Sequence, residues 1–120
     1  MLTKLVTWVK SFFTRSEFVV QGSPRSPKWD TFRTKFVANK RCAVCDCNKN
    51  LQAHHKKPFN EHPELELDEN NLVVLCQQCH FAIGHLFNYR LYNHDIDNSV
   101  KYFRLLIKRA KAHLKRNSTV

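Results

Sequence analysis

The chain has 120 residues, 42% of them hydrophobic and 25% charged, which is typical of one globular domain with short arms and excludes a disordered protein. No apolar run is long enough to span a bilayer. The run between Lys4 and Lys10 has five residues, too few for a signal peptide. We therefore expect an intracellular, cytoplasmic protein, in which paired cysteines are more often metal ligands than disulfides.

The net charge of +10 is concentrated at the two ends of the chain. Residues 1–40 carry eight Lys/Arg and two acids, and residues 86–120 also carry eight and two, so each flank has +6. Residues 41–85 carry four Lys/Arg and six acids, a net of −2. Cationic flanks favour a polyanion such as nucleic acid, and an acidic centre favours divalent cations. The alternative is that the basic side chains only solvate helix faces.

The N-terminal part divides into an arm, a linker and a helix. Residues 1–21 are predicted to form an amphipathic arm that packs as a helix or binds a membrane surface or a partner. The Gly-, Ser- and Pro-rich residues 22–27 form a linker. A helix follows, with Ser26 as its N-cap and Pro27 at its first position. Its aromatic residues share one face at helical spacing and are predicted to be core: Trp29, Phe32 and Phe36.

The central part is predicted to alternate short strands with one helix. Residues 51–55 form a strand that ends at a histidine doublet, and residues 58–70 form a polar, acidic loop. Residues 72–75 are β-branched in their centre and form a second strand. Residues 77–87 are predicted to be a helix that carries His80, with Gly84 near its end.

The last predicted element is a helix over residues 99–116, capped by Asn98 or Ser99. Its apolar positions recur at spacings of three and four: Val100, Phe103, Ile107, Ala110 and Leu114. A cationic stripe lies one residue over: Lys101, Arg104, Lys108, Lys111 and Lys115. We expect the apolar face to pack and the cationic stripe to contact phosphates or remain solvated.

Two Cys-x-x-Cys pairs predict a structural zinc site, with Cys42 and Cys45 in one knuckle and Cys76 and Cys79 in the other. The intervening 30 residues are too few to bury a useful core alone, and bound zinc offsets that deficit. Cys47 could replace Cys45, but Cys-x-Cys pairing is geometrically tighter, so Cys47 is predicted to be free.

The zinc pairs bracket the His54-His55 doublet and Asn71, and His80 follows directly after Cys79. This order resembles the HNH endonuclease family, the ββα-metal or His-Me finger nucleases. The matching residues are 51–58, 70–80 and 84–85, within a resemblance that covers about 29–90. The continuation through 88–93 is similar to the small HNH enzymes of bacteriophages. A phage origin would place the protein in the bacterial host cytoplasm.

This resemblance implies an α+β fold. Residues 28–90 would form a small ββα-metal nuclease core with a treble-clef-like four-cysteine zinc site. Helices would flank this core at both ends, with residues 91–120 a basic C-terminal helix packing on it.

The resemblance also implies a role for each site residue. His55 would be the general base that takes a proton from water, a task suited to imidazole. His54 and His80 would bind a catalytic divalent ion, with His85 completing the site. Asn71 would serve catalysis by orienting the loop that bears His55 or by joining the metal shell. The ion would be Mg²⁺, or one of the softer ions that imidazole favours, such as Mn²⁺, Ni²⁺ or Zn²⁺.

The implied substrate is DNA, most simply double-stranded and held through its backbone. Cleavage would leave a 5′ phosphate, as a nick or a double-strand break, by a monomer or a homodimer. The candidate contacts to nucleic acid are Lys56, Lys57, Arg90, Lys101, Arg104 and Lys108. The alternatives are a non-catalytic, zinc-stabilised DNA-binding or packaging accessory module, and an RNA-directed nuclease with the same centre.

Overall fold

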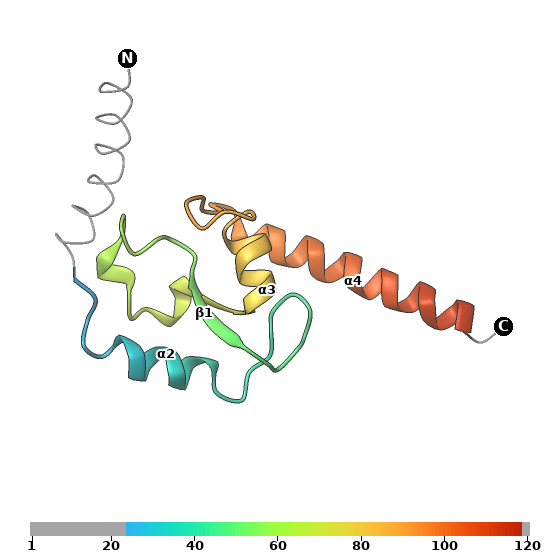
Figure 1. Ribbon diagram of the computed structural model, residues 1–120, viewed down its shortest axis with the longest axis horizontal. Coiled ribbons are helices and arrows are strands. Elements are labelled where there is room, and N and C mark those ends of the chain that lie inside the picture. The colour runs from blue at the N-terminus through green and yellow to red at the C-terminus, as the bar shows by residue number, and fades with distance from the viewer. Residues whose placement is uncertain (1–23, 119–120) are drawn as a thin grey trace, which may run out of the picture.

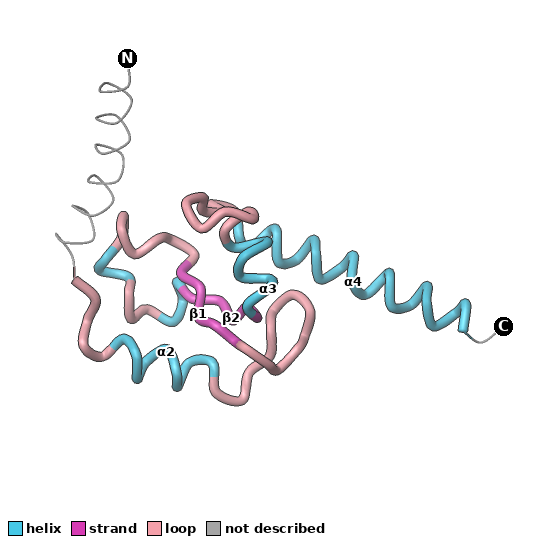
Figure 2. Tube along the Cα trace, in the orientation of Figure 1, coloured by secondary structure: helices cyan, strands magenta, loops and turns pink. Residues whose placement is uncertain are grey.

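The computed structural model describes residues 24–118, so the predicted arm over residues 1–21 lies outside the described part. Helices surround one small two-stranded sheet (Figures 1 and 2). The elements in chain order are α2 (Trp29–Val37), β1 (Leu51–His55), η1 (Pro63–Leu65), η2 (Glu69–Asn71), β2 (Leu72–Cys76), α3 (Gln77–Cys79), η3 (His80–Gly84) and α4 (Ile96–Ser118). The predicted α+β class, with a ββα centre, is confirmed.

The two strands pair antiparallel, with His54 opposite Val73 and His55 opposite Leu72. Successive side chains of a strand point to opposite faces of the sheet. The histidine doublet therefore sends one imidazole to each side of β1. The strand β2 leads directly into α3, so the two paired strands and this helix lie next to one another (Figure 2).

The helix α2 differs from its prediction in its start and in its burial. It begins at Trp29 after the N-cap Lys28. Ser26 lies in the turn before the helix, where its Oγ accepts the Lys28 N–H at 3.2 Å. None of its residues is buried, and Phe32 and Phe36 are only half-buried. The prediction that its aromatic face is core is wrong, since a two-stranded sheet offers a helix little apolar surface to cover.

The core is small and is built around the cysteines. Its buried members come from both knuckles, β2, η3 and the start of α4: Cys42, Val44, Leu75, Cys76, Ile83 and Ile96. Two of the six are cysteines of the predicted zinc site, so a metal ion rather than apolar burial is expected to supply much of the stability.

The helix α4 begins at Ile96 rather than at residue 99. Ile96 is buried, and Val100 and Ile107 are packed on the core. Every described residue after Ile107 is exposed, with Leu114 at 67%, and this half projects away from the core (Figure 1). The apolar stripe therefore packs only along the first half, because 23 residues extend about 35 Å, beyond the reach of so small a core. Within residues 24–118, no helix combines the length and the hydropathy that a membrane span needs.

Candidate metal centres and active site

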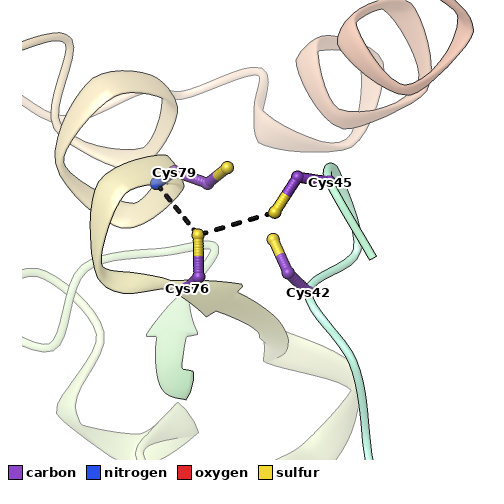
Figure 3. Close-up of side chains that lie close together, drawn as sticks. All are labelled: Cys42, Cys45, Cys76 and Cys79. Atoms are coloured by element: carbon purple, nitrogen blue, oxygen red, sulfur yellow. Dashed lines mark hydrogen bonds between the residues drawn. The ribbon is translucent and has the colours of Figure 1, made fainter. Parts of the chain in front are cut away.

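The four predicted zinc ligands converge from two parts of the chain (Figure 3). Cys42 and Cys45 lie in the loop before β1, Cys76 ends β2, and Cys79 ends α3. The four Sγ atoms lie within 4.8 Å of one another, and those of Cys45 and Cys76 are 3.7 Å apart. Tetrahedral zinc with Zn–S bonds of about 2.3 Å separates its sulfurs by about 3.8 Å. The cluster thus has the dimensions of a closed zinc site, and Cys47 stays outside it.

The thiols in this cluster differ in acidity. Burial raises the pKa of Cys45 to about 12. Burial opposes ionisation of Cys42 as well, but nearby backbone N–H groups outweigh it and lower the pKa to about 7. No disulfide joins the described cysteines. A dication is the group that would stabilise all four thiolates together, so the donor set fits zinc.

A second cluster holds three histidines, whose ligand atoms also lie within 4.8 Å of one another: His54, His80 and His85. The Nε2 atom of His54 and the Nδ1 atom of His80 are buried and have no hydrogen-bond partner. Buried polar atoms of native proteins are nearly always paired, and a role as a metal ligand is one recognised reason for an exception. Two buried nitrogens without partners, in a cluster of three imidazoles, fit a divalent cation.

A wide helical turn brings His80 and His85 together. The helix predicted over residues 77–87 is present over 77–84, as α3 followed by a π turn, His80–Gly84, and it ends before residue 87. The N–H of His85 donates to the carbonyl of His80 at 3.1 Å, five residues back. In an α-helix that spacing would separate the two imidazoles by about 140°, whereas the wider π turn brings them closer to one side of the helix. Such turns occur frequently at functional sites.

Gly84 leaves the space that the ring of His54 occupies. A Cβ at position 84 would lie 2.9 Å from Cε1 and 3.1 Å from Nδ1 of His54. We expect Gly84→Ala to lower affinity for the histidine-bound ion by about 10- to 100-fold, the range for groups that orient metal ligands. Helix propensity alone would make the same change stabilising by about 1 kcal/mol. Calorimetric Mn²⁺ titration checks this, with unchanged zinc content as the control; unchanged Mn²⁺ affinity would contradict it.

The environment of the three histidines keeps them ready to bind an ion. Burial, aided by the neighbouring imidazoles, lowers the pKa of His54 to about 3. Burial and the charge of His85 lower the pKa of His80 to about 4. Both are therefore neutral near pH 7, as metal ligation requires. Nδ1 of His85 donates to the Leu91 carbonyl at 2.9 Å, which leaves Nε2 as the ligand atom.

His55 lies on the other face of β1, in a setting suited to a base. Its Nε2 is 3.0 Å from the carbonyl oxygen of Glu66. A carbonyl only accepts, so Nε2 carries the proton and Nδ1 keeps a lone pair. The ring stacks on Trp29 with centroids 4.6 Å apart. Burial lowers the pKa of His55, so its neutral form predominates at neutral pH.

Asn71 holds the chain that follows His55. Its Oδ1 accepts the Lys57 N–H at 2.9 Å, and its Nδ2 donates to the Lys57 carbonyl at 3.1 Å. The Lys56 N–H donates to the Asn71 carbonyl at 2.7 Å. Both ends of the amide are thus engaged with backbone, which corresponds to the loop-orienting alternative, and Asn71 is not among the clustered ligands.

Sequence reasoning missed several residues that shape this site. Tyr92 stacks on His54 with centroids 5.0 Å apart, and its hydroxyl donates to the His55 carbonyl. Burial raises the pKa of Tyr92, so that hydroxyl keeps its proton. Glu66 is buried; its Oε1 accepts the Ser26 N–H at 2.8 Å, and its Oε2 lies 3.7 Å from Arg25. These contacts join distant positions, and no motif in the sequence predicts them.

The proposed nucleic-acid contacts have different surroundings. Lys56 pairs with Asp97 at 3.0 Å. Arg104 is half-buried and donates to the Ala43 carbonyl at 3.1 Å, so it braces the first zinc knuckle. The remaining candidates are exposed: Lys57, Arg90, Lys101 and Lys108.

One cavity of about 660 Å³ brings the histidines together with cationic and aromatic walls. The side chains that line the cavity include four histidines: His54, His55, His80 and His85. Three arginines in its walls contribute positive charge: Arg25, Arg33 and Arg90. Its size and charge suit a phosphate group with its flanking sugars.

The comparisons agree with this geometry. Residues 42–85 match the family model described as HNH endonuclease. Neither the curated proteins nor the solved structures contain a match to the chain. The matched segment begins at the first zinc cysteine and ends at the third clustered histidine, and an HNH domain indicates a metal-binding nuclease that acts on DNA. The match over residues 42–85 thus supports an HNH endonuclease domain in this segment of the chain.

Proposed function

We propose that this protein is a metal-dependent endonuclease that hydrolyses phosphodiester bonds of DNA. The observation that carries the proposal is the arrangement around β1. On one face, two buried imidazole nitrogens without partners and a third imidazole fit one divalent ion. On the other, His55 keeps a free Nδ1, and both faces open on the same cavity.

The residues that would hold the ion are His54, His80 and His85. When bound, a divalent ion polarises the scissile phosphate and stabilises the charge on the leaving 3′ oxygen. Three imidazoles are a softer donor set than the oxygen ligands that Mg²⁺ prefers. We therefore expect Mn²⁺ and Ni²⁺ to support cleavage at lower concentrations than Mg²⁺.

The protein's own residues account for the proton transfer. Nδ1 of His55 takes a proton from the attacking water, and the imidazolium that forms keeps its Nε2–H on the Glu66 carbonyl. Tyr92 holds the His55 carbonyl and Asn71 holds the next part of the chain. Because the backbone is fixed on both sides, the base is positioned before substrate arrives.

Cleavage of supercoiled plasmid by the full-length protein tests the proposal. We expect nicked or linear product with added Mn²⁺, Ni²⁺ or Mg²⁺, and none without added ion. His80→Ala should retain its zinc yet need a higher ion concentration. If no ion supports cleavage while zinc content and DNA binding are intact, the protein is a binding module and the enzyme proposal fails.

The pH dependence should reflect the buried base. Since burial lowers the pKa of His55, its neutral form persists below the ordinary histidine value of about 6.5. The acid limb of kcat/KM, which reports the free enzyme, should therefore have its midpoint below about pH 6.5. The measurement uses saturating Mn²⁺, so that ion binding does not limit the rate. A midpoint on the alkaline side of that value would assign the base to another group.

A further inference from the structure

The segment after the π turn exposes large apolar side chains to solvent. Within residues 86–91, which we call the aromatic rim, Phe87 is 72% exposed and Tyr89 is 60% exposed. Leu86 and Leu91 are also exposed, at 47% and 48%. A contiguous apolar patch beside a polar cavity indicates a surface that contacts a ligand.

Hydrogen bonds hold the rim in a defined shape. The N–H of Phe87 donates to the Phe81 carbonyl at 3.0 Å, and that of Leu91 to the Asn88 carbonyl at 2.8 Å. Leu86 and Phe87 have φ values of 52° and 64°, a left-handed conformation that bulky residues rarely adopt. Strain of this kind persists where the surrounding structure maintains it, and it concentrates at functional sites.

The rim borders the position of the reacting phosphate. The ring of Tyr89 lies 5.2 Å from His85 and 6.3 Å from His80, centroid to centroid. Phe81 supports both exposed rings, at 4.9 Å from Tyr89 and 6.0 Å from Phe87. Tyr89 also lines the cavity that holds His55. Phosphate oxygens give these rings nothing to bind, whereas nucleobases present apolar π faces.

We propose that the aromatic rim stacks on an unpaired or unstacked nucleobase next to the scissile phosphate. In a continuous duplex the neighbouring bases cover these faces, so the rim favours DNA at gaps, bulges or junctions. The inference rests on the proposed function only in placing the cleaved strand in the cavity with His55. It assigns the substrate preference to Phe87 and Tyr89.

Binding measurements in a His55→Ala background, without added catalytic ion, test this. Two duplexes of the same sequence are compared. One is continuous, and the other has a short gap in one strand, with 2-aminopurine in the unpaired stretch of the opposite strand. We expect about tenfold tighter binding to the gapped duplex, as base–aromatic stacking allows, with quenched 2-aminopurine fluorescence. Phe87→Ala/Tyr89→Ala should remove both effects. The control Tyr102→Ala, at a ring 59% exposed on α4, should remove neither.

The outcomes separate the inference from the proposed function. Equal binding of the two duplexes, or a preference that survives the double substitution, overturns the inference even if plasmid cleavage is normal. If no added ion supports cleavage of the plasmid, the enzyme proposal is overturned, whatever the binding preference of the protein. If the double substitution changes the sedimentation mass of the free protein and leaves DNA binding unchanged, the rim is a protein interface and the inference is wrong.

Discussion

Replacing His55 by alanine is expected to slow DNA cleavage by about 10²- to 10⁴-fold, the contribution of a general base, with little change in DNA affinity. The change removes the lone pair on Nδ1 and leaves the three clustered histidines in place. Single-turnover cleavage of a labelled duplex gives the rate, and fluorescence anisotropy gives the affinity.

His55 is only 6% exposed and stacks on Trp29, so its replacement could also disturb packing. Two controls distinguish the loss of a base from the loss of a packing residue. Added imidazole should restore part of the rate of His55→Ala, since it can occupy the vacated space and accept the proton. His62→Ala, in the neighbouring loop, should cleave normally. Equal loss of rate and of DNA affinity, without rescue by imidazole, would assign His55 a structural role.

Replacing Cys76 by serine is expected to have the largest effect on stability. Structural zinc sites contribute apparent binding energies of about 10–16 kcal/mol at pH 7, which is comparable with the whole stability of a typical small domain, about 5–15 kcal/mol. Cys76 is buried in the core cluster and ends β2. We therefore expect Cys76→Ser to lose its zinc and its helical circular dichroism together at 25 °C.

Cys47→Ser is the matched control, because Cys47 is half-buried nearby but lies outside the four-sulfur cluster. It should retain one zinc per chain, measured by atomic absorption, and melt within a few degrees of the parent. If Cys76→Ser kept a cooperative melting transition without zinc, the stabilising role of the metal would be contradicted.

The sequence predicted the parts of the fold that local patterns specify. The Cys-x-x-Cys pairs, the two strands and the histidine doublet lie where their spacing predicts, because each depends on a few neighbouring residues. The helix boundaries were less accurate. The helix α2 starts at Trp29, two residues after the predicted first position Pro27, and Ser26 lies in the turn before it.

The rest depended on contacts between distant positions. Tyr92 reaches back to His55 and His54, and Glu66 presents its carbonyl to His55 across 11 positions. Neither residue belongs to a periodic pattern. The amino-acid composition of residues 80–84 also does not predict the π turn at His80–Gly84. The close approach of Gly84 to the ring of His54 exists only after the sheet and the helix have packed.

The antiparallel register of β1 also limits which changes in chain length the proposed site can tolerate. Side-chain direction alternates along a strand, and a shift of one residue reverses every face. Deleting Gln52 or Ala53 would move His54 to the side of the base and His55 to the side of the ion, if the pairing at Leu51 with Cys76 held. Substitutions at these positions leave His54 and His55 on opposite faces of the strand. Among length changes between Leu51 and the doublet, only those in even numbers would conserve the face of each histidine.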